Sequence, residues 1–215
     1  MSSMTQAAGT TESVRAPGQF TLSYPDTWWT LDLDAQTRDA AIRRKIEAQA
    51  PGDDVDRELL DALIRATRKT AREAHAQGAL QVAGMIQFTE SGAVLSATAL
   101  VMRVTPPEDS STDLAELLIP VALKNADNPM GRGTRANRVE MVELSGVGAV
   151  GRATSIEDID YWGRGTVRTA TMHTVVPVPH SRDFLVISCL TPNLSLVDAF
   201  FDLFDAISGT LRFLP

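Results

Sequence analysis

The stretch Leu80–Met102 constrains the fold more than any other, because Glu90 is its only charged side chain. Apolar side chains recur at every second position over residues 80–88, which is the period of a β-strand. A second apolar run, residues 93–104, follows a short polar loop that contains Gly92, so the pair predicts a long antiparallel hairpin. The polar interruptions and the period near two argue against a membrane-spanning helix, which needs about 20 apolar residues. We therefore expect this hairpin in the middle of a sheet that the rest of the chain covers.

Helices are predicted before and after this hairpin. The spacing of apolar side chains and of capping residues predicts four of them, over about residues 37–48, 53–77, 113–121 and 195–208. Gly78 and Gly209 should end the second and the fourth helix, and Pro120 should kink or shorten the third. Asn193 or Ser195 should cap the last one.

Short alternating runs predict further strands, at residues 19–24, 28–33, 138–144, 147–155, 166–176, 184–190 and 211–213. A Pro-Asp turn should join the first two as an N-terminal hairpin, and the next four follow one another at hairpin spacing, as in an antiparallel meander. The predicted fold class is therefore α+β, an α/β/α sandwich with a central antiparallel sheet flanked by helices. We expect residues 1–18 to form a disordered tail and residues 19–215 a single domain, with a helical insertion at about 37–77 as an outer layer.

Charge and cysteine content limit the function classes. The chain contains 20 Lys and Arg residues and 27 Asp and Glu residues, which gives a net charge of −7. This negative charge argues against non-specific binding to nucleic acid or to an anionic membrane. Cys189 is the only cysteine, so neither an intrachain disulfide nor a cysteine-based zinc site can form within one chain. No secretory leader is readable in residues 1–19. We expect a cytoplasmic protein that does not insert into a membrane.

Four segments carry a resemblance to a known family: the opening QFTLSYPDTWW, the middle strand pair followed by a helix, the meander, and the final amphipathic helix that runs into GTLRF. Together they are similar to the PsbP-like superfamily over about residues 19–214. Its branches include photosystem extrinsic proteins, a nuclear Ran-binding factor, actinobacterial lipoproteins, and small bacterial chaperones of secretion effectors. The resemblance implies an α/β/α sandwich. The chain departs from the lipoprotein branch because it has no lipobox cysteine, and no binding residue of the family can be carried over.

Two glycine-arginine loops are the first candidate binding elements. Gly131-Arg132-Gly133-Thr134 recurs as Gly163-Arg164-Gly165-Thr166, each with a further arginine soon after, at Arg135 and Arg168. Accessible backbone amides and guanidinium forks suit a phosphate, a carboxylate or an acidic partner. Flexible turns that lead into strands would explain the same residues, so both interpretations stay open.

An acidic loop with two aromatic residues is the second candidate. Glu157, Asp158 and Asp160 precede Tyr161 and Trp162. The loop lacks the glycine and the terminal glutamate of an EF-hand, so calcium is not expected. Tyr and Trp dominate the energetics of many interfaces, whereas a buried Trp162 would fill the core instead.

The remaining polar groups form no catalytic or metal-binding constellation in the sequence. Three histidines lie far apart and without metal-ligand spacing: His75, His173 and His180. The His-Ser-x-Asp sequence at 180–183 lies along one turn, where the members of a catalytic triad seldom converge. An acidic row in the last helix matches a solvated face: Asp198, Asp202 and Asp205. We expect no cofactor, no metal and no enzyme activity.

The leading functional hypothesis is a non-catalytic adaptor, chaperone or accessory subunit in the bacterial cytoplasm, with a link to a secretion system as one option. It would bind another protein, and a homodimer is a further option, whereas nucleic acid is not expected. The residues proposed for partner binding are Tyr161, Trp162, Arg132, Arg135, Arg164 and Arg168. The alternative is a small-ligand or anion-binding module that uses the gap between sheet and helices, with the loop arginines at its mouth. An enzyme of unrecognised type ranks third.

Overall fold

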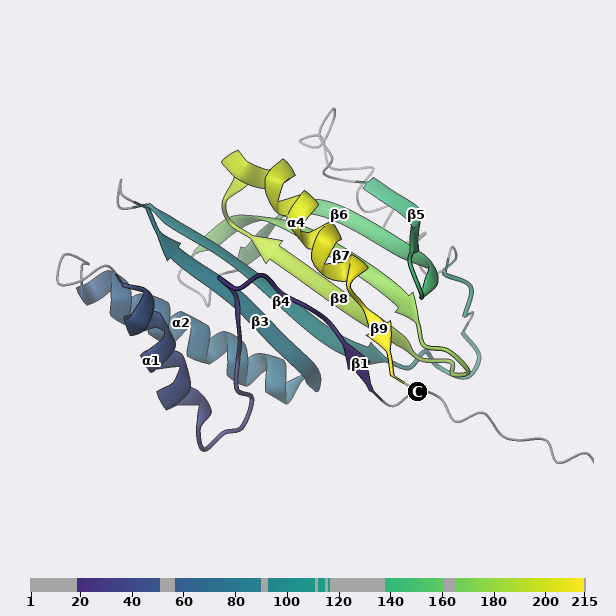
Figure 1. Ribbon diagram of the computed structural model, residues 1–215, viewed down its shortest axis with the longest axis horizontal. Coiled ribbons are helices and arrows are strands. Elements are labelled where there is room, and N and C mark those ends of the chain that lie inside the picture. The colour runs from purple at the N-terminus through teal and green to yellow at the C-terminus, as the bar shows by residue number, and fades with distance from the viewer. Residues whose placement is uncertain are drawn as a thin grey trace, which may run out of the picture.

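The computed structural model describes residues 19–50, 57–89, 93–110, 112–114, 116, 138–160 and 165–214. The protein has at its centre a seven-stranded antiparallel sheet in the order β2-β3-β4-β8-β7-β6-β5 (Figure 1). Its strands are β2 (Trp29–Thr30), β3 (Ala79–Phe88), β4 (Val94–Val104), β5 (Arg138–Leu144), β6 (Gly148–Asp160), β7 (Thr166–Pro177) and β8 (Phe184–Thr191). The predicted central hairpin is β3 with β4, and the predicted meander runs from β5 to β8. Both predictions are confirmed.

The predicted N-terminal hairpin is wrong, because its two strands belong to different sheets. β1 (Phe20–Thr21) pairs with the last strand, β9 (Arg212–Phe213), in a separate two-stranded sheet. A turn closed by a hydrogen bond from the Trp28 amide to the Pro25 carbonyl (2.9 Å) then leads the chain to the edge of the main sheet. There Trp28 and Trp29 are buried in two different core clusters, one on each face of that sheet. This burial of two large rings is more favourable than a short isolated hairpin.

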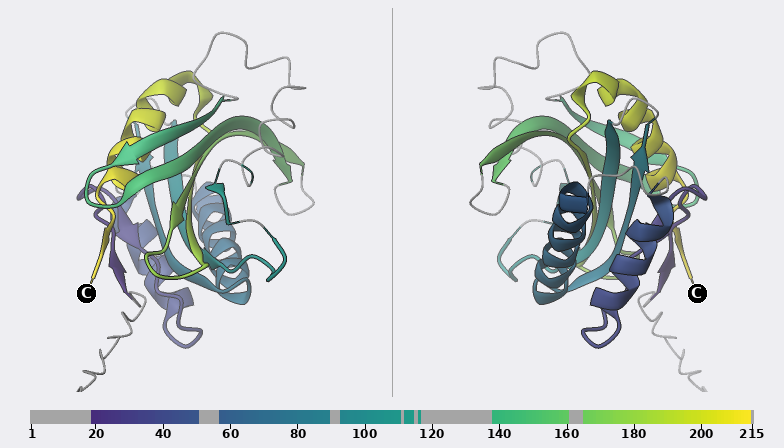
Figure 2. Two further views of the ribbon diagram at one scale, coloured as in Figure 1. Left: turned by 90° about the vertical axis from the view of Figure 1, so that its right-hand side faces the viewer. Right: turned by 90° about the vertical axis from the view of Figure 1, so that its left-hand side faces the viewer.

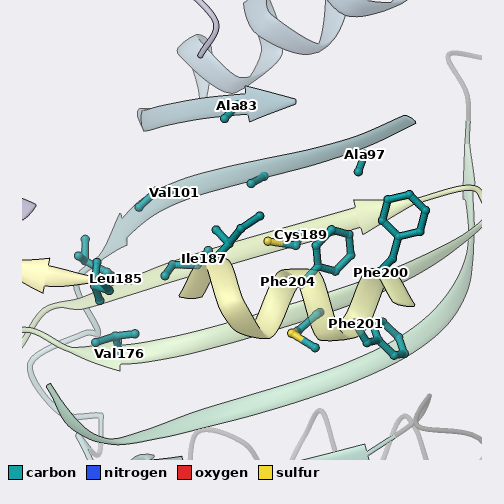
Figure 3. Packing of buried hydrophobic residues seen from close by; sticks show 14 of the residues in the cluster. Ala83, Ala97, Val101, Val176, Leu185, Ile187, Cys189, Phe200, Phe201 and Phe204 are labelled. Carbon is teal, nitrogen blue, oxygen red and sulfur yellow. The ribbon is translucent and has the colours of Figure 1, made fainter. Parts of the chain in front are cut away.

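Helices cover both faces of the main sheet, which confirms the α+β class and the sandwich layering. α1 (Arg38–Gln49) and α2 (Arg57–Ala76) pack against β3 on one side, and α4 (Val197–Gly209) packs against β7 and β8 on the other (Figure 2). The larger core cluster lies beneath α4, from which Phe200, Phe201 and Phe204 project onto the strands (Figure 3). A smaller cluster joins the two other helices to Trp29 and Ile86. Alternate residues of β3 therefore enter different cores.

The ends of the helices show which capping predictions hold. Gly78 follows α2 with a φ of +79°, a conformation that glycine adopts without steric cost, so it ends this helix as predicted. The short 3₁₀ helix η3 (Leu194–Leu196) precedes α4, and the Asn193 side chain caps neither of them. Instead, Asn193 accepts a hydrogen bond from the Ser96 amide (2.9 Å) and donates one to the Val94 carbonyl (3.0 Å). It therefore ties the start of the last helix to β4.

β6 is longer than predicted, and the predicted acidic loop is wrong. Glu157, Asp158 and Asp160 lie in β6, where the ladder with β7 continues to the pair Asp160 and Thr166. Pairing with a complete neighbouring strand outweighs the low strand preference of Asp and Glu. The predicted tail and most of the helix predicted over residues 113–121 lie outside the described residues.

Candidate functional site

A cleft opens between α2 and the face of the sheet opposite to α4. Its larger part, here called the outer chamber, has a volume of about 390 Å³. The helix and the ends of four strands supply its walls. The lining residues are Lys69, Thr70, Glu73, Ser96, Ala97, Thr98, Ile159, Val167, Thr169, Leu190 and Pro192.

A smaller part of the cleft, here called the inner chamber, reaches further beneath α2 toward the edge of the sheet. It has a volume of about 90 Å³. Its own lining residues are Trp29, Leu31, Leu63, Ala66, Thr67, Gly84, Met85 and Ile86. Thr70, Ser96, Ala97 and Thr98 line both chambers, so the two volumes meet at these residues.

Small side chains between helix and sheet leave this space open. The helix turns toward the sheet with alanines that are buried, among them Ala66, Ala71 and Ala74. Gly84 lies directly opposite Trp29 in the ladder, and a Cβ at this glycine would lie 3.0 Å from the Ala97 carbonyl oxygen. Figure 2 also shows the far ends of β6 and β7 curving toward the side of the sheet that carries α2. The cleft is therefore bounded by the helix on one side and by curved strands on the other.

Three hydroxyl groups stand where the chambers meet. Thr70 comes from α2, and Ser96 and Thr98 are alternate residues of β4, so both strand side chains point to the same face. Within the described part of the chain, the hydrogen bonds of Ser96 come from its backbone, and neither threonine hydroxyl has a hydrogen-bond partner. The three hydroxyls are thus available to a ligand, as donors or as acceptors.

The outer chamber carries one ion pair at its rim. Lys69 Nζ lies 3.6 Å from Glu73 Oε1, one helical turn along α2, and both side chains are about half exposed (44% and 51%). Such exposed pairs contribute little to stability and rearrange easily. The rim is therefore polar, while the floor formed by Ile159, Val167 and Leu190 is apolar. The side chain of Ala97 points the other way, into the core beneath α4.

Only one of the six residues predicted for partner binding, Arg168, is among the described residues. Arg132, Arg135, Tyr161, Trp162 and Arg164 lie outside the described residues. Arg168 lies in β7, but it does not line the cleft.

Arg168 pairs across the ladder with Asp158. Its Nε and Nη2 donate to the two carboxylate oxygens of Asp158 at 2.9 and 3.0 Å. This bidentate hydrogen bond lowers the pKa of Asp158 and raises that of Arg168. Successive strand residues point to opposite faces, so Arg168 points away from the face on which Val167 and Thr169 line the outer chamber.

Two further polar groupings bear on chemistry. His173 Nδ1 lies 2.9 Å from Ser188 Oγ, a contact between neighbouring strands that only the register of β7 and β8 reveals. In the turn that carries His180, the Asp183 carboxylate accepts a hydrogen bond from Thr105 (2.7 Å), and the Asp183 amide donates one to Ser181 Oγ (3.0 Å). Within the described ranges, no group of three or more His, Cys, Asp or Glu side chains could hold a metal ion.

The sequence prediction missed the residues of the cleft, although a signal was present. Ser96 and Thr98 interrupt the apolar run of β4 at alternate positions, which marks a polar strip on one face of a buried strand. The strip gains a meaning only when α2 is placed above it.

Comparison with known proteins adds a likeness at the level of structure. No protein-family model matches the chain, and no curated protein matches its sequence. Among solved structures, LpqN, involved in cell envelope biogenesis of Mycobacterium tuberculosis, is similar with a TM-score of 0.48 and 12% sequence identity. The match covers 95% of this chain and 88% of that chain. At this level of similarity we take nothing about function from it, and membership of the PsbP-like superfamily stays a prediction.

One further finding concerns the helices. Among the described residues, none of the helices is both long and apolar enough to cross a membrane.

Proposed function

We propose that this protein is a non-catalytic binding protein that holds a small, mainly apolar ligand in the cleft beneath α2. The observation that supports the proposal is the outer chamber, whose volume of about 390 Å³ lies within the range of ligand pockets, about 300–1,000 Å³. Such pockets combine an apolar lining with a few polar groups that fix the orientation of the ligand. The apolar floor and the three hydroxyls of Thr70, Ser96 and Thr98 have this composition.

Ligand binding to variants with a filled or an unchanged cleft tests the proposal. Butylbenzene, an uncharged hydrocarbon, should bind saturably and with one-to-one stoichiometry in a calorimetric titration. Thr98→Phe places a ring where the two chambers meet, and we expect it to weaken this binding at least ~10-fold, because the apolar contacts of several carbon atoms are lost. Thr21→Phe makes the same change at an exposed position of β1, outside the cleft, and should leave binding unchanged.

The proposed function would be contradicted if the protein bound no butylbenzene. It would also be contradicted if the Thr98→Phe variant were folded and bound butylbenzene as well as the unchanged protein does. The melting temperature of each variant shows whether it is folded. Native mass spectrometry of the protein purified from its host provides a second test, since a retained small molecule should be lost from Thr98→Phe.

The predicted cytoplasmic protein-binding adaptor is the second candidate function. The observation that favours it is the edge strand β5, which pairs only with β6 among the described strands, and in which Met141 is 50% exposed. An edge strand offers backbone hydrogen-bonding groups to a partner chain. If a partner protein adds a strand to β5, the partner should no longer co-purify with the Met141→Lys variant. Leu196→Lys changes an exposed residue that precedes α4, and the partner should still co-purify with this control variant. Equal recovery of the partner with both variants would argue against this surface.

A further inference from the structure

We infer that the inner chamber binds the carbonyl-bearing end of a neutral, mainly apolar ligand, and that the indole N–H of Trp29 donates a hydrogen bond to that carbonyl. This inference rests on the proposed function and names the class of ligand: small ketones, esters or amides with an apolar body. The body would occupy the outer chamber, and the short polar end would enter the inner one.

The first argument is a buried donor without an acceptor. Trp29 is 8% exposed and lines the inner chamber, and its buried Nε1 has no hydrogen-bond partner among the described residues. Buried indole N–H groups usually find an acceptor, because desolvating a donor without replacing its hydrogen bond is unfavourable. An indole nitrogen can only donate. Less than 1 Å² of this nitrogen is accessible in the structure, so a small rotation of the indole would bring it to a ligand. A ligand that it reaches would have to supply an acceptor, such as a carbonyl oxygen.

The second argument is the charge of the chamber. The described residues that line it are apolar or carry hydroxyls, and none of these is charged. Lys69 lines the outer chamber, not the inner one, and is paired with Glu73. A carboxylate in the inner chamber would lose its hydration without gaining a cation, which is strongly unfavourable. A neutral acceptor avoids this cost.

The third argument is size. The inner chamber has a volume of about 90 Å³. A cavity that holds benzene in another protein measures ~150 Å³, so a ring does not fit here and a short acyl group does. The larger outer chamber accepts a ring. The hydroxyls of Ser96 and Thr98 stand between the two parts and can bond a second polar atom of the ligand.

Two probes with the same carbon skeleton test the inference. Benzylacetone has a ketone carbonyl where butylbenzene has a methylene group, so the ratio of their dissociation constants isolates the contribution of the carbonyl. We expect Trp29→Phe to reduce the preference for the ketone about 3- to 10-fold, the effect of losing one hydrogen bond. Trp28→Phe is the matched control, because its indole N–H is also buried without a partner but lies in the core beneath α4, outside the cleft. It should leave the ratio unchanged.

A measurement on the unchanged protein covers the case in which Trp29→Phe does not fold. Benzylacetone should shift the indole N–H resonance of Trp29 downfield in a nitrogen-proton correlation spectrum, and butylbenzene should not. If both probes bind but the ratio is the same in Trp29→Phe, or the resonance responds equally to both, the inference is overturned while the proposed function stands. If neither probe binds to the unchanged protein, both are overturned.

Discussion

The ion pair of Arg152 with Asp205 allows a prediction about stability in which the two partners behave differently. Arg152 lies on β6 beneath α4, and its side chain is only 6% exposed, whereas that of Asp205 is 47% exposed. Arg152 Nη1 lies 2.6 Å from Asp205 Oδ1, Nη2 donates a weak hydrogen bond to Ser208 Oγ (3.4 Å), and Nε is buried without a partner. Within the described part of the chain, the guanidinium therefore depends on the half-exposed carboxylate of Asp205 for its charge compensation.

Removing either partner has a different consequence. Asp205→Ala leaves a buried cation, and breaking a buried pair typically costs ~3–5 kcal/mol. Because Asp205 is about half exposed and water can replace part of its interaction, we expect about 2–3 kcal/mol here. Arg152→Met removes the charge and the unpartnered Nε together and leaves Asp205 accessible to water, so it should cost less than ~1 kcal/mol. The double variant should be more stable than Asp205→Ala alone.

Urea unfolding at neutral pH measures these differences, with Asp198→Ala as the control. Asp198 is an exposed aspartate in the first turn of the same helix, where its interaction with the helix dipole contributes ~0.3–1 kcal/mol. The reasoning would be refuted if Asp205→Ala cost no more than Asp198→Ala. It would also be refuted if Arg152→Met destabilised the protein more than the single variants Asp205→Ala and Asp198→Ala do.

Three further predictions follow from burial and charge. Burial raises the pKa of the Cys189 thiol to about 12, so it should resist alkylation at pH 8 in the folded protein and react only after unfolding; rapid modification of the folded protein would contradict this. Phe204 is fully buried beneath α4, so Phe204→Ala should lower the free energy of unfolding by about 3–5 kcal/mol. A decrease below ~1 kcal/mol in urea unfolding would show that Phe204 is not part of the core. The pKa of Asp158 lies below its ordinary value of 3.8 because Arg168 donates hydrogen bonds to the carboxylate. The pair therefore stabilises the fold above pH 3.8, and this stabilisation is lost as the pH falls through the lowered pKa. Asp158→Asn should make the free energy of unfolding fall less steeply at acid pH, and an unaltered pH dependence would argue against the pair.

The outer layer formed by α1 and α2 was predicted from its charged surface and narrow apolar stripe. The structure adds that only a few side chains of this layer are fully buried, among them Ile42, Ile46 and Ile64. We expect its amides to exchange faster than those of β3 and β4, and equal protection in hydrogen exchange would place the core elsewhere.

The site could be predicted only as a region. A ligand site in the gap between sheet and helices was the second of three functional hypotheses from the sequence, but none of its lining residues was identified. Thr70 and Thr98 are separated by an entire strand and a turn, and Val167 lies far beyond both in the chain. A pocket is a property of groups that meet in space and leave room between them, and one sequence contains no signal for unfilled volume.

The sequence by itself determined which segments became strands and helices where the hydrophobic period was long. The alternation in β3 and β4, the meander and the end of α2 at Gly78 are local properties, set by side-chain direction and by backbone conformations open to glycine. Only the tertiary structure decided the partners of β1 and β2, the length of β6 and the contact of Asp205 with Arg152. These depend on which surfaces remain uncovered after the large sheet has formed. A two-residue strand or a single carboxylate is too weak to choose its neighbour until that sheet presents one.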